Sequence, residues 1–158
     1  MNEFRVPTIC LAVDIRCVDG CSVVGDIFLP ARSSLKPGPM RLEEWSDTVP
    51  TFFPVRSRDT HTTTLMNRDA VVALTVPAAA NEDADKGLSG SLVFRVAVDA
   101  GGERFEGDIM IDMPPQYSRV ADWLNAPCGF ITLRTGGVHH LIQKRHVARV
   151  VELDGGRG

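Results

Sequence analysis

Aromatic residues, basic charge and long apolar segments are all scarce in this chain of 158 residues. Aromatic side chains make up 6%, and 17 Lys and Arg are outnumbered by 20 Asp and Glu, for a formal net charge of −3 at pH 7. A general nucleic-acid or anionic-membrane binder would carry a basic surplus instead. No apolar run approaches the roughly 18 residues of a membrane-spanning helix. Because the first residues also lack the basic and apolar segments of a signal peptide, the sequence predicts a cytoplasmic protein.

The usual motifs of catalysis and cofactor binding are missing as well. The sequence contains no nucleotide-binding loop, nucleophile elbow, zinc motif or dinucleotide fingerprint. Hydrophobic residues at 44% and charged residues at 23% are nevertheless ordinary for a globular protein with a core. The sequence therefore predicts a folded protein that is not an enzyme and that holds no cofactor or metal.

Four cysteines are present, but they lack the spacing of a metal site. Cys17 and Cys21 bracket a turn at 18–20, an arrangement that allows a disulfide or half of a metal site. No second cysteine pair has the spacing that would complete a zinc site. We therefore interpret them, with Cys10 and Cys128, as free and partly buried thiols in a reducing cytosol.

Histidines and aspartates offer few further candidates for chemistry. Two adjacent histidines in an expected hairpin point to opposite faces of a strand, so they cannot easily share one metal. A cysteine near them allows a Cys–His nucleophile pair, and an aspartate after each of two repeated glycines allows a paired acid and base. We interpret all of them as structural or solvent-facing residues. They are His139 and His140, with His61 in the matching hairpin, Cys128, Asp26 and Asp108.

Four blocks from the first half of the chain recur in the same order in the second half. The blocks 25–29, 41–47, 52–57 and 66–74 recur as 107–111, 119–125, 130–135 and 142–150. The spacing falls from 82 to 76 residues across loop-like stretches, where insertions are tolerated. The repeat predicts a tandem duplication: module one at 7–77, an acidic and alanine-rich linker at 78–90, module two at 91–153 and a disordered tail at 154–158.

Each module is predicted to be mainly β. Apolar residues alternate over 9–15 and again over 92–98, and each stretch leads into an Asp-Gly or Gly-Gly turn, which is typical of a hairpin. A glycine marks a bend in each returning strand. A short helix pinned by a tryptophan follows, and closing strands complete a β-β-α-β-β order, the last one long enough for a further strand after a bend. We expect two small, strongly bent sheets or barrels related by a pseudo-twofold axis. The predicted structural core includes Trp45, Trp123, Gly25 and Gly107.

The pattern Ile142-x-Lys144-Arg145-His146-Val147-x-x-Val150 resembles the end of Sm-like and SH3-like small barrels. In those barrels a strand, a tight turn and a short final strand close the fold. Over nearly the whole chain, a Gly-Asp-Ile segment, a proline loop, an Arg-x-x-x-Trp-x-Asx helix and a Phe-led strand resemble small bacterial modules of unassigned function. The resemblance implies a small-barrel fold, and it implies no catalytic chemistry.

Basic residues are concentrated in one part of the sequence. Lys144 and Arg145 lie together in the closing pattern, with Arg134 and Arg149 nearby. Such a patch could bind a phosphate, a nucleotide or RNA. The matching stretch of module one is half neutralised by aspartates, and aromatic residues for base stacking are few. We therefore expect nucleic acid to be a less favoured partner than protein.

The sequence favours a non-catalytic adaptor or regulatory subunit that binds a protein partner or itself. Two like modules offer two like edges, which suit strand addition or symmetric assembly. The expected edges are the first strand of each module, with Ile9, Leu11 and Phe94 as their apolar contacts. The alternatives are an Sm-like RNA or oligonucleotide binder and a small-ligand or nucleotide sensor.

Overall fold

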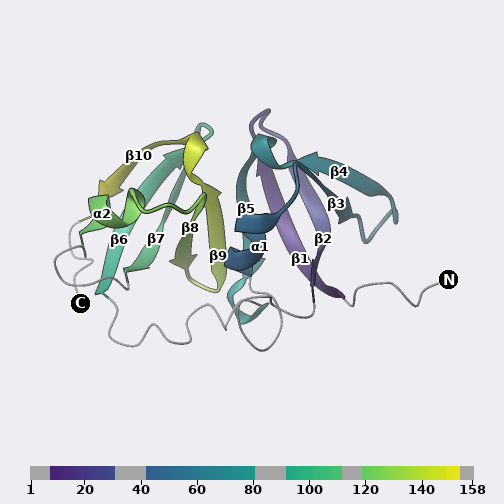
Figure 1. Ribbon diagram of the computed structural model, residues 1–158, viewed down its shortest axis with the longest axis horizontal. Helices are drawn as coiled ribbons and strands as arrows, with labels where there is room; N and C mark the ends of the chain where they lie inside the picture. The colour runs from purple at the N-terminus through teal and green to yellow at the C-terminus, as the bar shows by residue number, and fades with distance from the viewer. Residues whose placement is uncertain (1–7, 31–41, 81–91, 112–118, 154–158) are drawn as a thin grey trace.

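Long hairpins begin each half of the chain, where apolar residues alternate (Figure 1). The computed structural model describes residues 8–30, 42–80, 92–111 and 119–153. The predicted tail at 154–158 and most of the predicted linker lie outside these residues. Gly20, Gly101 and Gly102 form the hairpin turns with φ angles of 85°, 59° and 81°, which glycine adopts without strain. The hairpin strands are β1 (Thr8–Cys17), β2 (Ser22–Pro30), β6 (Leu92–Ala100) and β7 (Glu103–Ile111).

A short helix and three shorter strands follow each hairpin in the same order. The elements of the first half are α1 (Leu42–Thr48), β3 (Phe52–Arg56), β4 (Thr63–Asn67) and β5 (Val71–Pro77). Those of the second half are α2 (Val120–Leu124), β8 (Phe130–Thr135), β9 (Val138–Gln143) and β10 (Val147–Glu152). A turn of 3-10 helix precedes each closing strand, η1 (Arg68–Ala70) before β5 and η4 (Lys144–His146) before β10.

The ten strands form one continuous antiparallel sheet in the order β10-β6-β7-β8-β9-β5-β1-β2-β3-β4. The order within the second half, β10-β6-β7-β8-β9, matches the order β5-β1-β2-β3-β4 within the first half. Fold prediction was right that the protein is mainly β with one short helix in each half. The two halves share one sheet, because β5 pairs with β9, and the closed barrels that the sequence allowed are not observed, since the sheet stays open at β10 and β4 among the described residues.

The pairing of β5 with β9, here called the seam, joins the two halves, and both strands bury apolar side chains on both faces of the sheet. Successive strand residues point to opposite faces of a sheet. Leu74 and Leu141 pair across the seam on one face, and Ala73 and Ile142 pair on the other. The first pair belongs to core one, which also contains Trp45, Phe53 and Val55. The second pair belongs to core two, which also contains Val98, Ile109 and Leu133.

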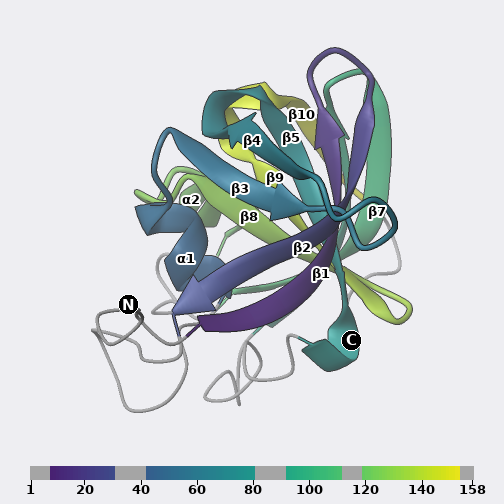
Figure 2. The ribbon, with the colours of Figure 1, turned by 90° about the vertical axis from the view of Figure 1, so that its right-hand side faces the viewer.

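Contacts beside the seam extend the connection between the halves. Helix α1 of the first half lies against β8 of the second half (Figure 2). Thr132 on β8 donates a hydrogen bond from Oγ1 to Glu43 Oε1 on α1, at 3.2 Å. Gln143 on β9 donates from Nε2 to the carbonyl oxygen of Val71, at 2.6 Å. The domain limits expected from the sequence stay a prediction, and each half of the sheet buries side chains of the other half.

Gly25 and Gly107 occupy matching places in β2 and β7, where a neighbouring strand approaches closely. A Cβ atom on Gly25 would lie 2.5 Å from the carbonyl oxygen of Arg56, and one on Gly107 would lie 2.6 Å from that of Arg134. Both distances are shorter than a real Cβ contact allows. The glycines therefore let β3 and β8 cross close to the hairpins, as an interior strand glycine often does.

The two tryptophans lie in the two cores but differ in exposure. Trp45 is buried in core one and meets the ring of Phe53 edge to face, with centroids 5.2 Å apart. Trp123 is half-buried and packs against core two. Each helix thus contacts its core through a tryptophan, and Trp45 is the more buried of the two.

Candidate functional site

Exposed apolar side chains gather on the β3–β4 hairpin at one end of the sheet. Phe52 is 56% exposed and Leu65 is 66% exposed. Leu65 pairs directly with Pro54 across the two strands, and Phe52 lies two residues before Pro54 on the same face. Phe52, Pro54 and Leu65 form the surface here called the β3–β4 patch.

The backbone of β4 is also open on the side away from β3. Arg68 donates its N–H to Thr51 O at 2.7 Å, and Ser57 donates its N–H to Thr62 O at 2.9 Å. Hydrogen-bonded pairs alternate along an antiparallel ladder, so Leu65 turns its N–H and C=O groups away from β3. No described strand pairs with β4 on that side. Free groups of this kind invite the pairing of a further strand.

The two end strands of the sheet differ in charge. Strand β4 has the sequence Thr-Thr-Leu-Met-Asn and carries no charged residue. Strand β10 carries Arg149 and Glu152, and Arg149 Nε lies 3.7 Å from Asp99 Oδ2. Charged side chains protect an edge strand from unintended pairing. The uncharged β4 edge is therefore the better candidate for binding a partner.

The edge residues predicted from the sequence lie on strands that are only partly interior. Strand β1 pairs with β2 from Thr8 onward but with β5 only over Asp14–Cys17. Ile9 is 44% exposed, whereas Leu11 and Phe94 are half-buried and pack against the two cores. Their role as an interface stays a prediction. Sequence reasoning missed β4, although its lack of charge was a signal that could have identified it.

The basic residues predicted to form an anion-binding patch bond different partners on different elements of the sheet. Lys144 donates from Nζ to the carbonyl oxygen of Ala126 at 2.7 Å. Arg145 forms an ion pair with Asp69 at 2.7 Å, across the seam. Arg149 lies near Asp99, as described above, and Arg134 lines a hollow on β8. The role of these four residues in binding an anion stays a prediction.

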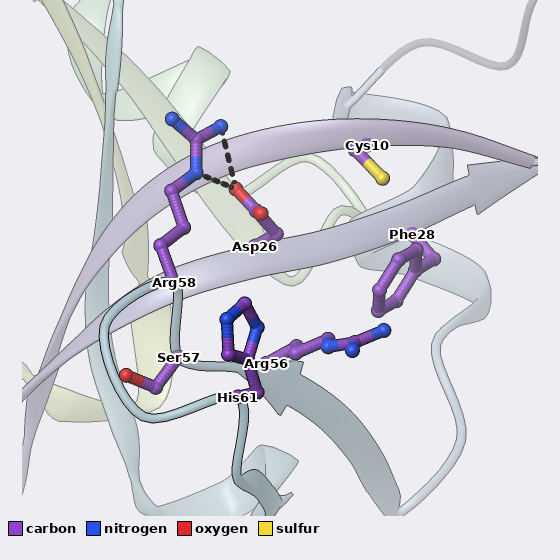
Figure 3. A pocket seen from close by; sticks show the side chains of 7 residues that line it. All are labelled: Cys10, Asp26, Phe28, Arg56, Ser57, Arg58 and His61. Atoms are coloured by element: carbon purple, nitrogen blue, oxygen red, sulfur yellow. Dashed lines mark hydrogen bonds and ion pairs between the residues drawn. The ribbon is translucent and has the colours of Figure 1, made fainter.

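Two shallow hollows occupy corresponding places beside β3 and β8. The first has a volume of about 290 Å³, and in it Arg58 places Nε and Nη2 each 2.8 Å from Asp26 Oδ1 (Figure 3). The second has a volume of about 260 Å³, and in it Arg95 lies 3.4 Å from Asp108. Each aspartate thus faces an arginine in its own hollow, and the structure does not bring the two together as an acid–base pair. The first hollow is lined by Cys10, Asp26, Phe28, Arg56, Ser57, Arg58 and His61.

The cysteines are free in this structure. Cys17 donates its backbone N–H to the carbonyl oxygen of Cys21 at 2.9 Å, but the two thiols are not bonded. Burial, helped by the charge of Asp19, raises the pKa of the Cys17 thiol, which lowers its reactivity. Within the described ranges, no three His, Cys, Asp or Glu residues gather as a metal site would require.

We predict that His140 makes the stability of the protein depend on pH. Its Nδ1 lies 2.7 Å from Thr75 Oγ1 across the seam, and burial is the main cause that lowers its pKa below 6.5. The unfolded chain, with an ordinary histidine pKa, then binds a proton more readily than the folded protein. We therefore expect the free energy of unfolding to fall as the pH drops below about 6.5. Urea unfolding at pH 7.5 and pH 5.5 measures the fall, and His140→Gln should reduce it; an equal fall in both proteins contradicts the prediction.

Comparison with protein-family models, with curated proteins and with solved structures finds no match to this chain. In the part of the chain that the structure describes, neither helix has the length and apolar character required to cross a membrane.

Proposed function

We propose that this chain is a non-catalytic protein-interaction subunit, an adaptor or regulatory protein, that binds a partner at its β4 edge. The observation that carries the proposal is the β3–β4 patch beside an unpaired and uncharged strand. A partner strand added to β4 would form main-chain hydrogen bonds with Leu65, and its apolar side chains would cover the patch. This is the usual way in which an open sheet edge binds an extended segment.

We also propose that the protein arose by duplication of one small β module. The repeated sequence blocks and the repeated order of strands support this proposal. The register supports it too, because β2 meets β3 at the pair Asp26–Arg56 and β7 meets β8 at the pair Asp108–Arg134. In a sheet built from two such modules side by side, β5 of the first module covers β9 of the second, while the corresponding strand β4 lies at the end of the sheet and stays open.

RNA or oligonucleotide binding, the alternative expected from the sequence, has less support. Lys144, Arg145 and Arg149, which were named for it, already bond a carboxylate or a carbonyl group. Base stacking needs exposed aromatic rings, and Phe52 is the single large aromatic side chain that is exposed among the described residues.

Capture of partners by immobilised protein tests the proposed function. We expect Leu65→Lys to abolish the capture of partners from a lysate of the native host, because a charge on β4 blocks strand addition. Val24→Lys is the matched control, since Val24 is also 66% exposed but lies on β2, between β1 and β3. Partners that bind the wild type and the Val24→Lys variant, but not the Leu65→Lys variant, would support the proposal. Equal capture by all three proteins would contradict it.

A further inference from the structure

We infer that the β3–β4 patch binds the β10 edge of a second copy of this chain, so that copies join head to tail. This inference rests on the proposed function and names the partner. It follows from the seam, which already joins the corresponding elements within one chain.

The register of the sheet places Leu65 in correspondence with Leu141. The repeat aligns Arg56 with Arg134. Arg56 pairs with Thr63 and Arg134 pairs with His139, so Thr63 corresponds to His139, and each following residue of β4 corresponds to the following residue of β9. By the same correspondence Phe52 matches Phe130, and Pro54 matches Thr132. In the second half these positions are covered by the first half, since Leu141 is fully buried, Thr132 is 9% exposed and Phe130 packs against core one. The β3–β4 patch is therefore the counterpart of an internal interface, without its cover.

Strand β10 and helix α2 are the counterparts of the elements that cover β8 and β9. Leu74 covers Leu141 at the seam, and Val150 holds the corresponding position in β10. Val150 facing Leu65 would keep an apolar pair at this place. Glu43 bonds Thr132 at the seam, and the repeat aligns Ala121 with Glu43. Pro54 facing Ala121 would thus replace a polar pair by an apolar pair, so both partners change together.

The open backbone groups of β4 and β10 match in the same register. Leu153 donates its N–H to Arg95 O at 2.9 Å, so by alternation Val150 turns its N–H and C=O groups away from β6. Leu65 turns the same groups away from β3. Val150 and Leu65 can therefore exchange two hydrogen bonds. At the seam Ala78 donates its N–H to Gly137 O at 2.8 Å, so by the same alternation Leu74 and Leu141 also form a hydrogen-bonded pair.

Charges near the ends of the strands limit the join rather than drive it. A head-to-tail join would set η4 of one copy against η1 of the next, but Asp69 of η1 already bonds Arg145 of its own copy across the seam. The main obstacle is Arg149, which takes the place of Ala73 and would face Met66. An arginine beside an apolar partner weakens the join unless its charged head stays in solvent, near Asp99. Arg149 therefore limits the strength of association.

Sedimentation velocity of the full chain, over low to high micromolar concentrations, tests the inference. We expect the wild-type protein to form species larger than a monomer and the Leu65→Lys variant to remain monomeric. Arg149→Ala, which restores the alanine of the seam, should tighten association by about tenfold, and Val24→Lys should leave it unchanged. A head-to-tail contact produces closed rings if its rotation closes and filaments if it does not, and either result supports the inference.

Cross-linking identifies which edges meet. Thr64 and Val151 correspond to His140 and Thr75, which face each other across the seam. In a background without the four native cysteines, we mix a Thr64→Cys protein with a Val151→Cys protein of different mass. Disulfides that join a Thr64→Cys chain to a Val151→Cys chain support the head-to-tail join. Disulfides that form only between two copies of the Thr64→Cys chain show a symmetric β4–β4 dimer and overturn it. A strictly monomeric wild-type protein also overturns it; the proposed function then still stands if capture of another protein depends on Leu65, and falls if it does not.

Discussion

Replacing Trp45 by alanine is expected to lower the free energy of unfolding by about 3–5 kcal/mol, which is typical of deleting a buried aromatic side chain. Trp45 is 7% exposed and contacts the ring of Phe53, so its removal leaves a cavity between α1 and β3. Helix α1 spans only Leu42–Thr48 and is too short to be stable without tertiary contacts. Loss of the tryptophan should therefore also loosen the helix from the sheet.

Trp123→Ala provides the comparison for this prediction. Trp123 holds the corresponding place on α2 but is half-buried. We expect a smaller loss of stability, because less apolar surface leaves contact with the core. Urea unfolding followed by far-UV circular dichroism measures both variants. Equal losses of stability, or a larger loss for Trp123→Ala, would contradict the prediction that the more buried tryptophan contributes more.

Replacing Leu141 by alanine should cost about 2–5 kcal/mol, whereas Leu65→Ala should change stability by no more than about 0.5 kcal/mol. The two leucines hold corresponding places in β9 and β4. Leu141 is fully buried against core one, across the seam from its own half, and Leu65 is 66% exposed. The difference in the free energy of unfolding between the two variants thus measures how much the burial of this position by the first half of the sheet contributes to stability.

The measurement requires dilute protein, so that contacts between copies do not add to the stability of the wild type. Both variants are compared by urea unfolding at the same low concentration. Similar losses for the two leucines would mean that the seam does not bury Leu141 in solution. The pair is well matched, because the residue type and the place on the strand are the same.

Local sequence patterns were sufficient to predict the strands, the hairpins and the bends. Alternating apolar residues report which side chains share a face, and Asp-Gly and Gly-Gly report turns, since both depend on neighbours in the chain. Gly25 and Gly107 lie inside β2 and β7, and Trp45 lies in core one. The candidate site was not predicted, because β4 and β9 have similar local patterns although one is an edge and the other is interior.

The tertiary structure alone decided that β5 lies beside β9. The seam pairs Thr75 with His140, 65 residues apart, and no local periodicity carries information about such a pairing. One signal was nevertheless present in the sequence: the segment Val71–Leu74 is wholly apolar, whereas its counterpart in β10 contains Arg149. A strand buried on both faces must be apolar throughout, while an edge strand tolerates charge. The sequence by itself thus determined a mainly β chain whose two halves have similar strand patterns, and the packing of the sheet determined that the first half covers part of the second and leaves β4 open.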